Sequence, residues 1–295
     1  MSRRAPDPVA AFGTTFQNPI LLAAGTAGFG HELADIVDLD ALGGIVTKAV
    51  SPHPRAGNAA PRVAEFGGGM LNAVGLANPG VERVAAEDLP WLAQHLRRAR
   101  VLVNVVGFVP EDYATVVTRL GEFTVIAAFE LNVSCPNTER GGEEFGADAT
   151  VLSDLIRRCR AVTDRPLVVK LAPTLPDIAG TAEAAAEAGA DGFTLVNTIP
   201  GTLYREMGRA GPAESRLGFG RGGVSGPALL AVGVLATRLV SERTGLPVIG
   251  AGGVRRIEDV RQYLEAGASL VAVGTAGLAH PRVPERLVRA WRRHG

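Results

Sequence analysis

Residues 166–198 read PLVVKLAPTLPDIAGTAEAAAEAGADGFTLVNT, and this stretch decides the fold. Two short apolar runs, 166–172 and 192–198, enclose an alanine-rich segment of helical period at 176–188. The runs are continuously apolar rather than alternating, which is typical of parallel strands covered on their outer face. The joint Glu187-Ala-Gly-Ala-Asp-Gly192 ends the helix on glycine and restarts a strand. The stretch therefore predicts one strand, helix and strand unit of a parallel sheet.

The same unit recurs along the chain. Strands are predicted at 20–24, 44–50, 101–107, 125–134, 166–172, 192–198, 247–253 and 269–276. Helices are predicted at 31–39, 81–98, 111–120, 150–163, 176–188, 226–244, 257–265 and 284–292. Eight such pairs predict an α/β fold, a (β/α)8 TIM barrel with long loops at its C-terminal face, and residues 1–295 as one domain. A doubly wound open sheet is the alternative.

Composition excludes several classes of function. The 30 Lys and Arg residues balance the 30 Asp and Glu residues, so charge gives no case for binding nucleic acid or an acidic membrane. No window approaches the ~18 uncharged apolar residues of a membrane span. Two cysteines, Cys135 and Cys159, are too few for a disulfide framework, and five histidines without ligand spacing give no case for a metal site. We expect a soluble protein of the cytoplasm.

Two predicted connections, 51–79 and 199–225, are too long for plain loops. Connections of that length inside a compact domain are usually functional or disordered. In the first, alternation at 62–66 before Gly67-Gly-Gly69 indicates a small hairpin.

Polar residues at the carboxyl ends of the strands are the candidates for chemistry, because active sites of this fold lie there. They are Thr47, Lys48, Asn104, Asn132, Ser134, Cys135, Lys170, Asn197 and Thr198. A lysine buried in an apolar strand needs an anion or a chemical role, so a structural ion pair is the alternative for Lys48 and for Lys170. The amides suit a planar ligand rich in carbonyl and N–H groups. The proline after Cys135 indicates a thiol at a strand mouth and favours reactivity, whereas Cys159 is expected to be packed in a helix.

Glycines follow the last two predicted strands, at Gly252-Gly253 and Gly274-Thr275. Bare backbone N–H groups at these places commonly hold phosphate in this fold. Together with Gly223-Val-Ser-Gly226, which opens a helix, they predict a phosphorylated ligand; glycines needed only for turning are the alternative. The match of residues 218–223 to the dinucleotide fingerprint lacks a preceding strand, so we do not interpret it as a Rossmann site.

These motifs together resemble the flavin-dependent dihydroorotate dehydrogenases of barrel type, nearly end to end. The resemblance is carried by Asn18-Pro-Ile, Lys48, Gly57-Asn, Pro61-Arg, MLNAVGLANPG at 70–80, ELNVSCPN at 130–137, Val169-Lys-Leu, Asn197-Thr198, Gly223-Val-Ser-Gly-Pro, Gly252-Gly253 and Gly274-Thr275. Within the family, Cys135 and a start almost directly at the first strand resemble the soluble cysteine class, and the motifs at 28–30, 70–78 and 130–137 resemble its NAD-linked branch.

The resemblance implies FMN across the barrel mouth and dihydroorotate stacked on its ring. The implied FMN contacts are Ala24, Gly25, Lys48, Ala49, Asn104, Asn132, Lys170, Val196, Gly226, Gly252, Gly253, Gly274 and Thr275. The implied substrate contacts are Lys48, Asn72, Ala73, Val74, Gly75, Leu76, Asn132, Asn137, Asn197 and Thr198. Lys170 is expected at the N1–C2 carbonyl edge of the flavin. Cys135 is implied as the catalytic base that removes the C5 proton while the C6 hydride passes to FMN, giving orotate for UMP biosynthesis.

The resemblance also implies a homodimer flanked by an electron-transfer subunit that carries FAD and a 2Fe–2S cluster and delivers electrons to NAD+. The segment 199–221 is longer than the usual NAD-linked pattern, and Ala24 and Thr26 stand where serine and cysteine are common. Three other functions remain open at this point. They are a dihydrouracil-type flavoenzyme, a phosphate-binding lyase or isomerase with Lys48 or Lys170 as a Schiff-base amine, and a non-catalytic binding barrel.

Overall fold

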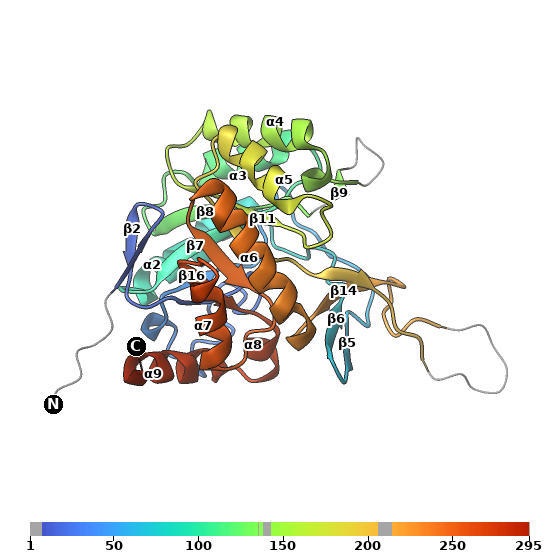
Figure 1. Cartoon of the computed structure of the whole chain (residues 1–295). Helices are drawn as coiled ribbons and strands as arrows, with labels where there is room; N and C mark the ends of the chain where they lie inside the picture. Colours follow the sequence, from blue (N-terminus) through green and yellow to red (C-terminus); the bar gives the residue numbers. More distant parts are fainter. Residues whose placement is uncertain (1–7, 135, 138–142, 206–213, 295) are drawn as a thin grey trace.

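The computed structural model describes residues 8–134, 136–137, 143–205 and 214–294. Within these ranges, eight parallel strands close into a barrel in chain order, with the last strand pairing with the first (Figure 1). They are β3 (Ile20–Leu22), β4 (Gly44–Val46), β7 (Arg100–Val105), β8 (Ile126–Asn132), β11 (Leu167–Leu171), β12 (Gly192–Leu195), β15 (Val248–Ala251) and β16 (Leu270–Val273). All eight lie at the predicted runs. The (β/α)8 barrel is confirmed, and the open sheet is wrong.

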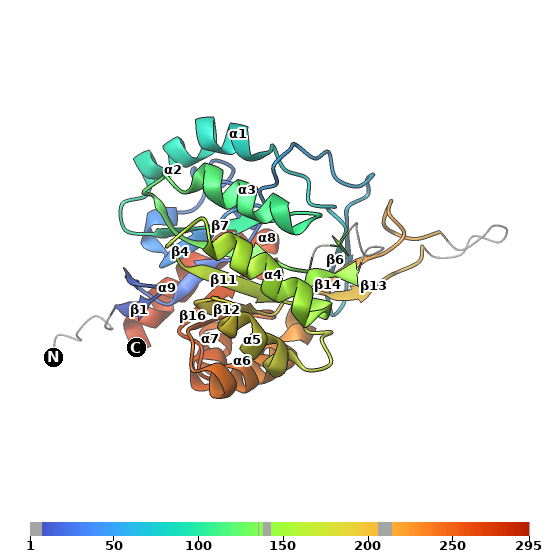
Figure 2. The same ribbon diagram turned by 90° about the horizontal axis from the view of Figure 1, so that it is seen from above.

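Helices cover the outside of the barrel, as the view from above shows (Figure 2). They are α1 (Val81–Arg83), the π-helical η2 (Val84–Asp88), α2 (Leu89–His95), α3 (Pro110–Leu120), α4 (Ala149–Arg160), α5 (Ile178–Glu187), α6 (Leu230–Thr244), α7 (Ile257–Glu265), α8 (Thr275–Ala279) and α9 (Val283–His294). Within the described ranges, none of these helices is both long enough and apolar enough to cross a bilayer.

One predicted helix is wrong in kind, and several predicted elements end too late: β4 ends at Val46 rather than at residue 50, β12 at Leu195 rather than at 198, and α2 at His95 rather than at 98. The helix expected at 31–39 is a series of turns, followed by the 3-10 helix η1 (Leu39–Ala41). Its backbone bonds span three residues, as from Leu33 N–H to Gly30, and the Glu32 carboxylate turns back to accept the Phe29 N–H at 3.1 Å. A strand was expected to continue to residue 276, but β16 ends at Val273 and α8 begins directly after Gly274.

The N-terminal end of the barrel is closed by a hairpin of β1 (Val9–Ala11) and β2 (Thr14–Phe16). Its two-residue turn, Phe12-Gly13, has positive φ at both positions, as a tight hairpin of the favoured hand requires. Phe12 and Phe16 are buried against the apolar residues that fill the barrel. A side chain at Gly192 would overlap the Phe12 ring, so glycine is needed there. The hairpin thus plugs the barrel from below.

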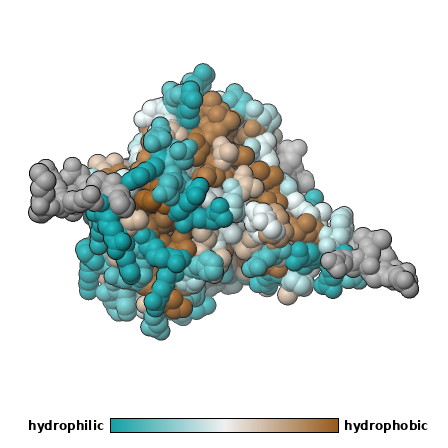
Figure 3. All heavy atoms as spheres, turned by 60° about the horizontal axis from the view of Figure 1, so that its bottom comes forward, coloured by the Kyte–Doolittle hydropathy of each residue, from teal (hydrophilic) through white to brown (hydrophobic). Residues whose placement is uncertain are grey.

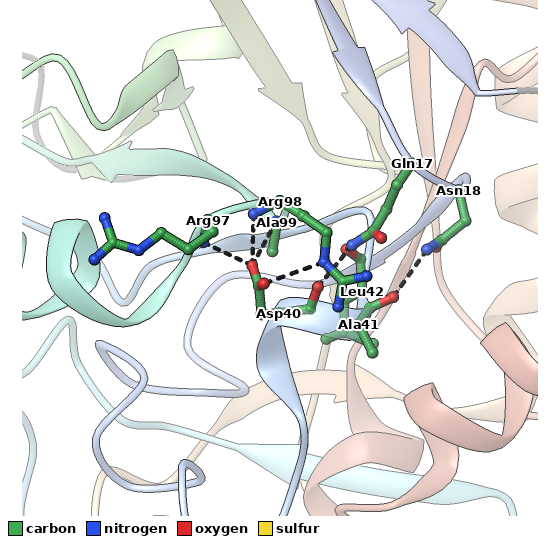
Figure 4. A network of polar contacts seen from close by, with 8 residues as sticks. All are labelled: Gln17, Asn18, Asp40, Ala41, Leu42, Arg97, Arg98 and Ala99. Atoms are coloured by element: carbon green, nitrogen blue, oxygen red, sulfur yellow. Dashed lines mark hydrogen bonds and ion pairs between the residues drawn. The ribbon is translucent and has the colours of Figure 1, made fainter.

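Carboxylate and amide groups fasten the chain at this same end (Figure 4). Asp40 accepts backbone N–H groups from Arg97 at 2.8 Å, Arg98 at 2.7 Å and Ala99 at 2.9 Å, which lead directly into β7. Arg98 Nε adds a contact to the same carboxylate at 3.3 Å. The amides of Gln17 and Asn18 donate to carbonyls of residues 40–42. The network therefore ties η1 to the starts of β3 and β7.

The two long connections meet in a four-stranded antiparallel sheet beside the barrel (Figure 1). Its order is β13 (Ile199–Gly201), β14 (Gly222–Ser225), β6 (Gly69–Asn72) and β5 (Val63–Phe66). The hairpin predicted in the first connection is confirmed. The two strands from the second connection were not predicted, because their sequence is rich in glycine and carries no alternation.

Several exposed apolar side chains lie on the helices near the C-terminus. They are Val232, Leu235 and Leu239 on α6 and Leu278 on α8. Figure 3 views the molecule from the side that carries these helices, where apolar surface lies among hydrophilic surface.

Candidate functional site

The site begins where polar side chains replace apolar ones inside the barrel. Side chains two residues apart share one face of a strand, and on three neighbouring strands an apolar residue in the lumen is followed two positions later by a polar one. The pairs are Leu102 and Asn104 on β7, Ala128 and Glu130 on β8, and Val168 and Lys170 on β11. The barrel is therefore apolar in its lower part and polar at its C-terminal mouth.

These three polar side chains form one buried cluster with Thr194 of β12. Asn104 and Thr194 donate to the Glu130 carboxylate, from Nδ2 at 2.7 Å and from Oγ1 at 2.6 Å. The ammonium of Lys170 lies 3.8 Å from Glu130 Oε1. That distance is longer than a hydrogen bond, so the two charges balance while the ammonium keeps its donors for another partner. An anion beside Lys170 was one of the two alternatives that the sequence left open.

One atom of this cluster has no partner. Asn104 is 1% exposed, and its Oδ1 meets no hydrogen-bond donor among the described residues. A buried acceptor without a donor costs free energy unless a ligand or water supplies one. Gly25 lies just after β3, at the same end of the barrel. A Cβ on Gly25 would meet no atom of the described chain within 4 Å. The barrel mouth therefore offers both an acceptor and open space.

The predicted amides of β8 and β12 come together. Asn197 Nδ2 donates to Asn132 Oδ1 at 3.3 Å, and Asn197 Oδ1 accepts the Thr198 N–H at 2.9 Å. The Tyr113 hydroxyl donates to the Asn132 carbonyl at 2.8 Å and so holds the end of β8. Asn132, Asn197 and Thr198 are all half-buried. The structure therefore brings these predicted residues together, and their role as substrate contacts stays a prediction.

The glycines predicted to hold phosphate lie at turns that require glycine. Gly226, Gly252 and Gly253 have φ values of +108°, +117° and +75°. The buried Tyr263 hydroxyl donates to the carbonyls of Ala251 and Gly252, each at 2.8 Å, and fixes this turn. Turning is thus one reason for these glycines, and it leaves the prediction of a phosphate site untested.

A hydroxyl pair joins the end of β14 to the end of β16. Thr275 Oγ1 donates to Ser225 Oγ at 2.8 Å, and Ser225 Oγ donates to the Met70 carbonyl of β6 at 3.3 Å. A Cβ on Gly226 would lie 2.8 Å from Gly69 Cα, so the four-stranded sheet approaches this turn closely. The predicted residues Gly226 and Thr275 are therefore neighbours.

The segment from Asn72 to Leu76 lies along the edge of that sheet. Asn72 Nδ2 donates to the Gly223 carbonyl at 3.3 Å, and Asn58 binds the carbonyls of Ala73 and Val74 at 3.1 Å each. Gly75 and Leu76 have positive φ, +70° and +59°. The structure therefore holds this predicted segment in a defined shape.

Lys48 follows β4 and is half-buried. Its ammonium has no carboxylate within ion-pair distance in the described ranges, so it differs from Lys170. The remaining predicted cofactor contacts also follow barrel strands directly. They are Ala24 after β3, Ala49 after β4, Val196 after β12 and Gly274 after β16.

Of the two cysteines, the structure describes Cys159 but not Cys135. Cys135, predicted as the catalytic base, lies outside the described residues, and so does the side chain of Asn137. Cys159 is fully buried on α4, and burial raises the pKa of its thiol to about 12. The expectation that Cys159 is packed is confirmed.

Sequence reasoning missed four residues of the site: Glu130, Thr194, Ser225 and Tyr263. Glu130 could have been found, because a carboxylate inside an apolar strand is rare unless it is paired. It also stands two residues before Asn132, on the same face of the strand. The hydroxyls of Thr194, Ser225 and Tyr263 carry no such signal, since these residue types are common in ordinary strands and helices.

The closed barrel with a polar C-terminal mouth defines the class, a (β/α)8-barrel enzyme. A model of the dihydroorotate dehydrogenase family matches residues 8–291. The chain is 44% identical, over 94% of its length and 87% of the relative's, to "Dihydroorotate dehydrogenase B (NAD(+)), catalytic subunit" of Exiguobacterium sibiricum. Proteins of the same name from Listeria monocytogenes serotype 4b and Cutibacterium acnes are each 43% identical over 94% of the chain and 89% of their own length. The chain belongs to the dihydroorotate dehydrogenase family.

Proposed function

We propose that the chain is a catalytic subunit that oxidises dihydroorotate to orotate in pyrimidine biosynthesis, with FMN as its bound cofactor. The observation that carries the proposal is the buried cluster at the mouth. It holds a buried cation, Lys170, and a buried acceptor without a donor, Asn104 Oδ1, at the C-terminal end of the strands in a barrel of this family.

The residues present fit FMN. A ring with adjacent carbonyl and N–H groups needs both donors and acceptors, which Lys170, Asn104 and Asn132 supply. The open space at Gly25 suits a flat ring, and the glycine turns at 226 and 252–253 with Thr275 suit its phosphate. When bound, FMN accepts the hydride that leaves C6 of the substrate.

The chain's own residues bind and deprotonate the substrate. The Lys48 ammonium would bind the substrate carboxylate, since it has no carboxylate partner of its own in the described ranges. The amides of Asn72, Asn132, Asn137 and Asn197, with Thr198, would bind the carbonyl and N–H groups of the pyrimidine ring. Cys135 would take the C5 proton. A free thiol has a pKa of about 8.5, so the surroundings of Cys135 must favour the thiolate for it to act near neutral pH.

We further propose that the chain works in the cytoplasm as a homodimer with an electron-transfer subunit. That subunit would carry FAD and a 2Fe–2S cluster and pass electrons to NAD+. The support is the name of the relatives, which are catalytic subunits of NAD(+)-linked enzymes. The buried free thiol of Cys159 also suits a reducing compartment.

The first prediction concerns Cys135. The purified chain should bind FMN and show a visible spectrum, and anaerobic dihydroorotate should bleach it in a stopped-flow trace. Cys135→Ala should keep bound FMN and lose bleaching by a factor of at least about 100, the range of general-base catalysis. Cys159→Ala is the matched control and should bleach normally.

Three results would contradict the proposal. Normal bleaching in Cys135→Ala would remove this thiol from the reaction. Bleaching of the native protein by dihydrouracil but not by dihydroorotate would change the substrate. Failure of the purified chain to bind FMN would contradict the proposal that the enzyme uses a flavin.

A further inference from the structure

The Glu130 carboxylate acts within the barrel rather than on a ligand. It is 1% exposed, and both of its oxygens are engaged. Oε1 accepts from Asn104 Nδ2 and lies 3.8 Å from Lys170 Nζ, and Oε2 accepts from Thr194 Oγ1. These partners come from three other strands, β7, β11 and β12. Any effect of Glu130 on the reaction must therefore pass through its neighbours.

The hydrogen bond from Asn104 decides which end of that amide is left for a ligand. With Nδ2 turned to Glu130 at 2.7 Å, Oδ1 is the end without a partner among the described residues. An amide can present either a donor or an acceptor, and only the acceptor end is left here. Glu130 thus fixes Asn104 as an acceptor for an N–H group.

The contact with Lys170 is electrostatic. At 3.8 Å the ammonium and the carboxylate attract strongly in a buried site but do not saturate each other's hydrogen bonds. The carboxylate therefore lowers the net positive charge at the mouth, while it holds the ammonium in place. Removing the carboxylate alone would leave the cation uncompensated.

We infer that Glu130 is a positioning residue that orients the Asn104 amide and balances the Lys170 ammonium, and that it thereby sets the reduction potential of the bound flavin. The inference rests on the proposed function, because it requires FMN at the mouth. A more positive site favours the added electron density of the reduced ring. Glu130 therefore keeps the flavin from being too strong an oxidant.

The test is the midpoint potential of bound FMN, measured by equilibration with a reference dye. Glu130→Gln keeps the shape and removes the charge, so the potential should become more positive by at least about 30 mV, which is tenfold for a two-electron couple. In a Lys170→Met background the same change should shift the potential by less, since the coupling to the ammonium is gone and only the charge of Glu130 and its bond to Asn104 remain. Asp40→Asn removes a hydrogen-bonded carboxylate at the opposite end of the barrel and should leave the potential unchanged.

Three outcomes are decisive. An unchanged potential in Glu130→Gln overturns the inference, and so does an equal shift with and without Lys170. Failure of the native chain to bind FMN instead overturns the proposed function, so the two failures are distinguishable.

Stability gives a second measurement if Glu130→Gln alone does not fold. Lys170→Met leaves a buried carboxylate without its counter-charge, which is costly, and Glu130→Gln/Lys170→Met removes both charges. The urea midpoint of the double variant should therefore equal or exceed that of Lys170→Met. A lower midpoint would mean that Glu130 and Lys170 are not coupled.

Discussion

At the scale of single residues, glycines with positive φ serve two different needs. Gly245 ends α6 with φ +65°, and a Cβ there would meet nothing within 4 Å. Gly25 has nearly the same backbone, φ +79°, and the same open surroundings, but it lies after β3 at the barrel mouth. A side chain at either position would therefore have the same cost of a left-handed backbone. Only a side chain at Gly25 would also enter the space proposed for the cofactor.

Gly25→Ala and Gly245→Ala form a matched pair. Each should lower the free energy of unfolding by about 1–2 kcal/mol, the cost of a side chain in the left-handed region, as read from urea denaturation. Gly25→Ala alone should weaken FMN binding, by about tenfold or more, because its methyl group enters the space of the ring. Titration of the apoprotein with quenching of FMN fluorescence measures this. Equal affinities in the two variants would exclude a flavin at Gly25.

Some residues of the site could be predicted and others could not. Lys170, Asn104 and Asn132 stand out because polar groups in apolar strands need a reason. Their partners do not stand out, since pairing across neighbouring strands depends on register, which the sequence does not state. Lys170 next to Glu130 is the example: the need for an anion is visible in the sequence, and the identity of the anion is not.

At the scale of elements, the join between η1 and β7 depends on one carboxylate (Figure 4). Burial would raise the pKa of Asp40, but the N–H groups of Ala99, Arg98 and Arg97 and the Arg98 side chain outweigh it and lower the pKa below its usual value. A carboxylate with a lowered folded-state pKa stabilises the fold above its unfolded pKa, about 3.9. That contribution is lost as the pH falls through the lower folded value.

Asp40→Asn should therefore destabilise the protein in a pH-dependent way. At pH 7 the free energy of unfolding should fall by about 2 kcal/mol, the range of hydrogen bonds to a charged group. The difference from the native protein should begin to shrink below about pH 4, where Asp40 of the unfolded chain takes up a proton, and should be lost once the pH has fallen through the lower folded pKa. Urea unfolding across this pH range measures it. The exposed pair partner Glu242 supplies the control, Glu242→Gln, which should change stability by less than about 0.5 kcal/mol at any pH. A constant difference for Asp40→Asn would contradict the role of its charge.

An element could be predicted from the sequence where its own residues carry the pattern that forms it. The eight strands are continuous apolar runs, and α7 begins and ends at the predicted residues, Ile257 and Glu265. The failures are elements whose form depends on distant partners. β14 is a strand because it pairs with β6 of the hairpin at 63–72, and β13 is a strand because it pairs with β14. The segment 31–39 forms turns although its sequence has helical period.

At the scale of the whole molecule, the proposed cofactor should contribute to stability. A ligand that binds only the folded state at 100 times its dissociation constant stabilises it by about 2.7 kcal/mol. For a chain of this size that is a rise in Tm of about 5–10 °C. Adding FMN to the apoprotein should produce this rise in a thermal denaturation scan.

Riboflavin is the control for the phosphate site. It shares the ring and lacks the phosphate, so it should raise Tm less than FMN at the same concentration if the glycine turns at 226 and 252–253 hold the phosphate. Equal rises in Tm with riboflavin and FMN would mean that those glycines serve only to turn the chain. Absence of any rise with either compound would argue against flavin binding.

The hairpin of β1 and β2 seals the lower opening, while the proposed chemistry occupies the upper one. Among the described residues, Phe12 and Phe16 fill the lower end with apolar side chains, so a polar substrate is expected to enter and leave at the upper end. Stability and turnover are thereby assigned to opposite ends of the lumen, and substitutions of Phe16 should act first on the former.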